Sequence, residues 1–209
     1  MVTNAKENIL KRIREALSNP VPLPFPQSEG NSDVFVKKNE EPAVIFAEEF
    51  SKLQGNFVFC KNEQDLKLQL SNLIQQKKWG KVYCIETQLR SILQAIEIPN
   101  YNNLSSCEVA VTGCEYLVAR TGTIVMNSAQ TSGRTISVYA PIHICIAYSN
   151  QLVYDVKDAL QNMKEKYTNG FPSFTTFASG PSRTADIEKT LVTGVHGPKE
   201  VFCFLVDSK

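Results

Sequence analysis

The sequence has little of what several large protein classes require. Only two histidines occur among 209 residues, and none of the six cysteines lies in a C-x-x-C pair. No apolar run reaches the roughly 18 residues that a membrane-spanning helix needs, and the charged stretch over residues 1–17 lacks the apolar core of a secretion signal. A net charge of +1 is too small a basic excess to favour a nucleic-acid binder. We therefore expect a cytoplasmic protein with no membrane span and no nucleic-acid partner.

Several common catalytic and cofactor motifs are absent too. There is no G-x-x-x-x-G-K-[ST], no G-x-G-x-x-G and no G-x-S-x-G, which disfavours a P-loop nucleotidase, a conventional dinucleotide dehydrogenase and an α/β-hydrolase. Most cysteines sit inside apolar runs such as FVFC and VFCFLV, which predicts buried, reduced thiols rather than a disulfide framework or an iron–sulfur site. With no metal-ligand spacing around the histidines, we predict no metal site and no cofactor in this chain.

The pattern along the chain predicts two parts, an arm over residues 1–41 and an α/β domain over residues 42–209. An amphipathic helix over residues 4–17 carries Ile9, Ile13 and Leu17 on one stripe, and four prolines within residues 20–26 predict an extended strap. A free helix this short is marginal in water, so we expect it to dock, either on its own domain or on another chain. The second alternative would allow a homo-oligomer formed through the arm.

The domain alternates predicted helices and strands, which indicates a mostly parallel sheet covered on both faces, a three-layer α/β sandwich. We expect helices over 43–53, 63–77, 87–96, 154–166 and 183–192, and strands over 57–60, 81–85, 135–148, 174–178 and 200–206. The helix over 154–166 should turn Val156, Leu160 and Met163 inward. The alternation of helices and strands is interrupted over residues 107–127, where short strands flank the turn Thr121-Gly122 with no room for a helix between them. This pattern predicts an antiparallel hairpin.

The most informative local signal is the stretch from Ser179 to Glu188, SGPSRTADIE, which follows a predicted strand and opens a predicted helix. Unpaired N–H groups at a helix N-terminus, with the Arg183 cation, would suit a phosphate or carboxylate. The structural alternative is equally open, because Ser182 or Thr184 can simply cap the helix.

Three further loops carry candidate groups. The turn Arg120-Thr-Gly-Thr123 can form an anion nest or an ordinary hairpin turn. His196 lies in the loop GVHGP over residues 194–198, whereas His143 lies between apolar residues and suits a satisfied core histidine. Three arginines lie in or near these loops, and they would form a basic pocket if they met in space: Arg120, Arg134 and Arg183. The candidate ligand-binding residues are Arg120, Thr121, Gly122, Thr123, Arg134, His143, Ser179, Gly180, Ser182, Arg183, Thr184 and His196; catalytic residues are not predicted.

Several of these motifs occur in an order that resembles a known family. EVAVTG at 108–113, ARTGTIVM at 119–126, PIH at 141–143, SGPSRTADIE at 179–188 and GVHGP at 194–198 are similar to the LUD domain, LutC/YkgG type, of lactate utilization proteins. The resemblance covers residues 42–207. One position departs, because the family usually has glutamate where this chain has Arg120. Any role of that acid is then lost here or moved, for example to Glu115.

The resemblance implies a NagB/RpiA/CoA-transferase-like α/β fold and a function as an accessory subunit of an L-lactate-to-pyruvate oxidising system. It implies iron–sulfur lactate utilization proteins as partners, with any iron–sulfur clusters in those partners. Together with the hydroxyl- and glycine-rich loops, it leads us to expect a small anionic metabolite, or an acidic surface of a partner, bound between residues 121–123 and 179–184. Two other functions stay open: a stand-alone enzyme acting on an acyl, CoA or nucleotide-type substrate, and a non-catalytic scaffold that uses its N-terminal arm.

Overall fold

The computed structural model describes residues 3–18, 35, 39–133, 135–187 and 190–207, and the chain divides into two units, Met1–Lys38 and Asn39–Lys209. In the first unit, α1 (Thr3–Ser18) is the predicted amphipathic helix. The proline strap over residues 20–26 lies outside the described residues. Within the described ranges, no helix combines the length and apolar character needed to cross a bilayer.

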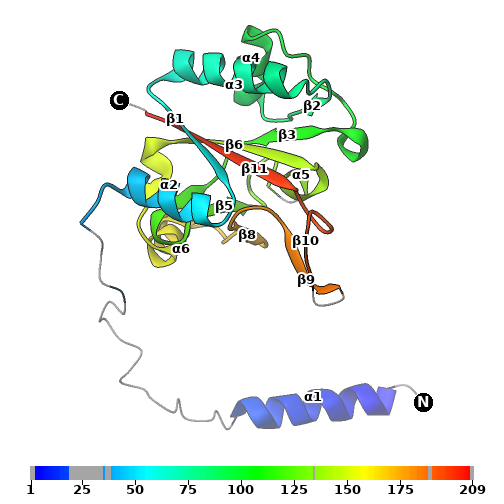
Figure 1. Ribbon diagram of the computed structural model, residues 1–209. Helices are drawn as coiled ribbons and strands as arrows, with labels where there is room; N and C mark the ends of the chain where they lie inside the picture. The colour runs from blue at the N-terminus through cyan, green and yellow to red at the C-terminus, as the bar shows by residue number, and fades with distance from the viewer. Residues whose placement is uncertain (1–2, 19–34, 36–38, 134, 188–189, 208–209) are drawn as a thin grey trace. The chain divides into compact units, whose positions relative to one another are not determined.

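The second unit is built on a five-stranded sheet in the order β1-β11-β6-β3-β2, with all neighbours parallel. Its strands are β1 (Asn56–Cys60), β2 (Val82–Tyr83), β3 (Val109–Thr112), β6 (Ile142–Tyr148) and β11 (Glu200–Val206). Two helices, α3 (Glu63–Lys77) and α4 (Thr87–Ala95), cover one face, as Figure 1 shows. The prediction of an α/β fold with a mostly parallel sheet is confirmed.

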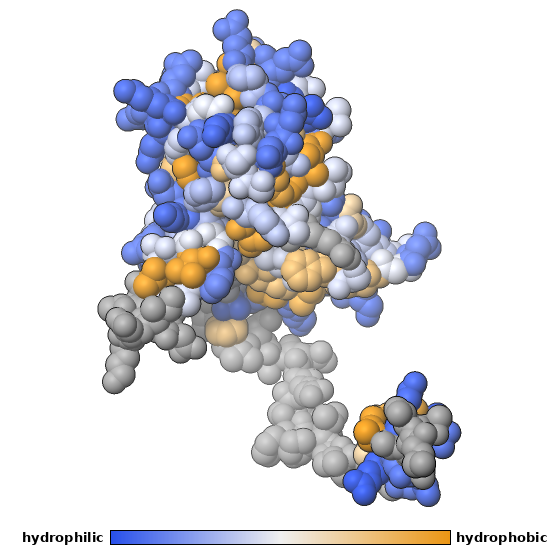
Figure 2. Space-filling view, turned by 90° about the vertical axis from the view of Figure 1, so that its right-hand side faces the viewer, coloured by the Kyte–Doolittle hydropathy of each residue, from blue (hydrophilic) through white to orange (hydrophobic). Residues whose placement is uncertain are grey.

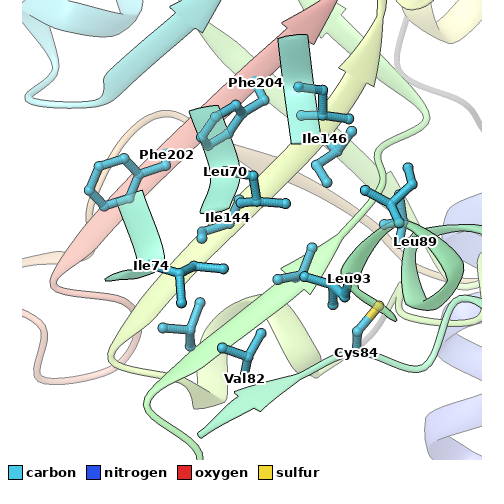
Figure 3. Close-up of a cluster of buried hydrophobic side chains, with 14 of the residues drawn as sticks. Leu70, Ile74, Val82, Cys84, Leu89, Leu93, Ile144, Ile146, Phe202 and Phe204 are labelled. Carbon is cyan, nitrogen blue, oxygen red and sulfur yellow. The ribbon is translucent and has the colours of Figure 1, made fainter. Parts of the chain in front are cut away.

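The core beneath α3 and α4 follows from the spacing of apolar residues. Leu66, Leu70 and Ile74 recur every four residues, so they share the helix face that meets the sheet. They pack against alternate residues of β6 and β11, including Ile144 and Phe204 (Figure 3). Each fully buried side chain of this size contributes about 1.5–3 kcal/mol. The Asn62 side chain accepts a hydrogen bond from the Asp65 N–H and begins α3.

The other face of the sheet carries α2 (Pro42–Lys52) and a second sheet, of four strands, in the order β7-β4-β5-β8. These strands are β7 (Leu152–Val153), β4 (Tyr116–Val118), β5 (Thr123–Asn127) and β8 (Thr175–Ala178). Antiparallel pairing of β4 with β5 confirms the predicted hairpin. Short 3-10 turns occupy Leu104–Ser106, Ala119–Thr121 and Ser149–Gln151.

Helix α6 (Val156–Lys166) packs on the second sheet through Ala159 and Met163, which contact Val118 and Val125. The predicted inward position of Leu160 is wrong, since that side chain is 39% exposed. The buried stripe follows the i, i+4 pair of Ala159 and Met163 instead.

Two predicted elements are wrong in type. Residues 136–139 form a helical turn, α5 (Ile136–Tyr139), rather than strand, because Ile136 is drawn into a cluster with Cys107 and Ala110. The predicted helix over 183–192 is an antiparallel hairpin of β9 (Arg183–Ile187) and β10 (Thr190–Thr193). Its β-branched residues, such as Thr184 and Val192, pair across the two strands and favour extended backbone. No helix N-terminus therefore exists at residues 182–184.

Candidate functional site

A cavity of about 240 Å³ gathers candidate residues from three distant parts of the chain. His143 comes from the second position of β6, Ser179, Gly180 and Ser182 follow β8, and His196 precedes β11. The cavity therefore lies near the amino ends of β6 and β11. Sequence reasoning expected a site beyond carboxyl ends of strands, and only β8, of the second sheet, fits that expectation.

Hydrogen bonds between the two family motifs form one wall of this cavity. The Ser182 N–H donates to the Pro198 carbonyl, and the Gly194 N–H donates to the Ser182 carbonyl, both at 2.9 Å. Gly197 allows this close approach, because a Cβ there would lie 2.9 Å from the Ser182 Cβ. The segments 179–182 and 194–198, distant in sequence, thus act as one surface.

The turn at residues 121–123 reaches the cavity only through a chain of hydroxyls. Thr121 Oγ1 lies 2.8 Å from Thr123 Oγ1, which lies 2.7 Å from Ser179 Oγ. Gly122 has a φ of +56° and packs so closely on α2 that a Cβ would lie 2.5 Å from the Phe50 nitrogen. Its N–H donates to the Ala119 carbonyl. The turn therefore makes the contacts of an ordinary hairpin turn. Its hydroxyls hold the Ser179 side chain through the hydrogen bond between Thr123 and Ser179.

Two of the three arginines of the predicted basic pocket bind other protein groups. Arg120 pairs with Asp155 through Nε at 2.7 Å and Nη2 at 3.1 Å, which raises the pKa of Arg120 and lowers that of Asp155. Arg183 donates from Nη2 to the Leu53 carbonyl at 2.5 Å. Neither lines the cavity. Arg134 lies outside the described residues, and Thr184 sits on β9, paired with Val192.

His143 is the most buried polar group of the cavity, with 1% of its surface exposed. Burial lowers its pKa to about 4, so the ring is neutral at pH 7. Its Nε2 lies 2.8 Å from Oγ1 of Thr112, which is itself fully buried at the end of β3. His196, by contrast, is an exposed residue at the rim. The cavity thus combines one fixed neutral imidazole with one accessible imidazole.

The surface on this side differs from the helical side of the domain. Figure 2 shows hydrophilic residues over the end where α3 and α4 lie, and apolar residues gathered lower on the same face. Val138, which lines the cavity, and Val195, which precedes His196 in the chain, are both more than two-fifths exposed. The cavity lining joins apolar side chains such as Val138 and Ala178 to the polar side chains of His143 and Ser182, which suits a small ligand with one apolar part.

None of the six cysteines lines this cavity. All six are buried and free, as predicted, and burial raises the pKa of Cys60 to about 12 and that of Cys84 to about 11. Such thiols stay protonated and unreactive. Among the residues that the structure describes, no group of three or more histidine, cysteine or acidic side chains could hold a metal ion.

The sequence did not predict a larger polar cavity of about 530 Å³ beside the carboxyl ends of β3 and β6, although it offered Glu115 as a position to which the role of the family's acid could have moved. Glu115, one of its lining residues, is 4% exposed and accepts hydrogen bonds from Lys166 at 2.6 Å and from Asn127 and Tyr167 at 3.0 Å. The only sign of this cavity in the sequence is an acidic residue, Glu115, shortly after the buried strand β3. Because the protein itself supplies these partners, we regard the Glu115 network as structural and the histidine cavity as the candidate site.

Comparisons with known proteins agree with the motifs at this cavity. A model of the LUD domain matches residues 86–206, which includes both cavity motifs. Lactate utilization protein C of Halalkalibacterium halodurans is 36% identical over 101 residues, 47% of this chain and 44% of the relative. The protein of the same name from Bacillus licheniformis is 32% identical over 112 residues, 53% of this chain and 47% of the relative.

The chain thus spans about half the length of the curated relatives it matches. A crystal structure of a DUF162 family protein from Deinococcus radiodurans superposes with a TM-score of 0.59 and 17% identity, covering 80% of this chain and 99% of that protein. This likeness supports the fold alone. Since the family model spans more than half of the sequence, the protein belongs to the LUD domain family.

Proposed function

We propose that this LUD protein serves in lactate utilization by binding a small carboxylate metabolite, lactate or pyruvate, in the cavity between His143 and His196. The observation that carries the proposal is the meeting of His143, Ser182 and His196 at one cavity. The relatives named lactate utilization protein C supply the class of ligand.

The chemistry of the lining supports a small hydroxylated or keto acid. The Ser182 hydroxyl and the His196 ring can donate hydrogen bonds to a carboxylate, a role first expected of Arg183. Val138 and Ala178 offer apolar contact for a methyl group. A large acyl-CoA or nucleotide fits poorly, because about 240 Å³ lies below the roughly 300–1,000 Å³ of pockets that hold even drug-sized ligands.

Calorimetric titration of the full chain with L-lactate and with pyruvate tests the binding. We expect saturable binding that His196→Ala weakens roughly tenfold to a hundredfold, since a hydrogen bond to a charged group is lost. Arg120→Ala is the matched control, because Arg120 pairs with Asp155 away from the cavity. No binding, or equal binding by the His196 variant, would reject the site.

The proposed place in the system is that of an accessory subunit beside iron–sulfur partner proteins. Assaying lactate oxidation by the chain alone and with the candidate partners tests this role. Turnover only in the mixture supports it, whereas turnover by the chain alone favours a stand-alone enzyme.

Deleting residues 1–26 tests whether the N-terminal arm holds a partner or a second copy of the chain. The mass in solution and the binding of the partner proteins are measured before and after the deletion. Unchanged mass and binding would reject that role.

A further inference from the structure

The proton of His143 has a position set by its neighbour. Thr112 has a single hydroxyl proton, and its Oγ1 donates to the Gly113 carbonyl at 2.9 Å. Toward the Nε2 atom of His143, 2.8 Å away, the same oxygen can then only accept a hydrogen bond. A neutral imidazole carries one proton, so that proton lies on Nε2. Both side chains are at least 99% buried, which shields the pair from competing water.

The other ring nitrogen, Nδ1, is left with a lone pair. Within the described part of the chain, no hydrogen bond joins it to a protein group, and the ring lines the cavity. Among the described residues, Thr175 Oγ1 is the one buried side-chain nitrogen or oxygen without a partner, so Nδ1, which also lacks one, is not sealed off and a ligand or water in the cavity can reach it. His143 therefore faces the cavity as a hydrogen-bond acceptor.

We propose that Thr112 holds His143 as an acceptor, so that the cavity selects α-hydroxy acids over α-keto acids. This inference rests on the proposed function, since it concerns the ligand of the same cavity. A hydroxy acid such as L-lactate donates its hydroxyl proton to Nδ1. A keto acid such as pyruvate offers only oxygen lone pairs there, and two facing acceptors repel each other. His143 is thus a specificity-determining residue, and Thr112 is its positioning residue.

The size of the preference follows from the hydrogen bond to Nδ1 that a hydroxy acid makes and a keto acid cannot make. The loss of that bond, with two acceptors left facing each other, corresponds to roughly a tenfold to hundredfold difference in dissociation constant between the two acids. A site that hydrogen-bonds a substrate hydroxyl generally rejects an analogue lacking the donor for this reason.

The test compares L-lactate with pyruvate by calorimetry in wild type, Thr112→Ser and Thr112→Val. The serine variant retains the hydroxyl and should keep the preference. The valine variant removes the acceptor for Nε2–H at nearly constant shape, so the preference should fall at least fivefold. Long-range proton–nitrogen NMR spectra of His143 supply a readout that a merely structural role would not move: protonation on Nε2 in wild type and the serine variant, and a shifted tautomer ratio in the valine variant.

The outcomes separate the two claims. Equal affinity for both acids in wild type, or a His143 ring protonated on Nδ1, overturns the inference and leaves the proposed function standing. Failure of both acids to bind overturns the proposed function and the inference with it. Thermal unfolding of each variant checks that it is folded before its affinity is compared.

Discussion

The burial of His143 predicts a specific loss of stability in weak acid. The ordinary pKa of histidine is 6.5, and burial lowers that of His143 to about 4. Between these values the unfolded chain binds a proton that the folded chain does not, so the free energy of unfolding falls as the pH falls. The full difference is about 3 kcal/mol, of which about 2 kcal/mol is lost by pH 5.

The substitution His143→Gln isolates this effect, because a glutamine amide is neutral at every pH. Urea unfolding followed by the fluorescence of Trp79 gives the free energy of unfolding of both proteins at pH 7.5, 6.5, 5.5 and 5. Hydrogen bonds lower the pKa values of Asp155 and Glu108, so protonation of these carboxylates at lower pH reduces the free energy of unfolding of both proteins. Their contribution cancels in the difference between the two proteins.

We expect the wild type to lose about 2 kcal/mol more than the His143→Gln variant between pH 7.5 and pH 5. The matched control is His196→Gln, which removes the exposed imidazole, keeps the buried one and should follow the wild-type curve. A wild-type-minus-variant difference that stays constant with pH would refute the burial argument, because it would mean that the folded and unfolded states protonate His143 equally.

Three further predictions concern the surroundings of the cavity. Gly197→Ala places a Cβ 2.9 Å from that of Ser182, so it should lower the free energy of unfolding by about 1–3 kcal/mol and weaken lactate binding; unchanged calorimetric affinity would contradict the close approach. Arg120→Ala should cost about 1 kcal/mol in urea unfolding, since its bidentate pair with Asp155 is only a quarter exposed, and a cost above 3 kcal/mol would show a larger role. The six thiols should react with a disulfide reagent at pH 8 far more slowly in native protein than in denaturant, and rapid native labelling would contradict their burial.

The elements that sequence predicted well are those with strong periodicity and local signals. The helix at residues 63–77 has apolar residues every four positions and a capping asparagine, Asn62, so its bounds match the structure. The closing strand at residues 200–206 is a continuous buried run. In both elements, the buried positions can be predicted from residues that are close together in the sequence.

The hairpin at residues 183–193 shows where such reasoning fails. The run SRTADIE resembles a capped helix start, yet the Ser182 N–H is bonded to the Pro198 carbonyl, sixteen residues further on. That partner cannot be identified from local spacing. The same holds for Arg120, whose position is decided by Asp155, 35 residues away. The candidate residues that do meet, such as Ser179 and His196, come from whole motifs rather than from single charged side chains.

A crystal structure of the full chain with L-lactate at saturating concentration would show whether the ligand hydroxyl is bound by His143. We expect the ligand in the cavity, with its hydroxyl within hydrogen-bond distance of His143 Nδ1 and its carboxylate near Ser182 and His196. Lactate bound instead beside Glu115 and Lys166, with the histidine cavity filled by solvent, would contradict this expectation.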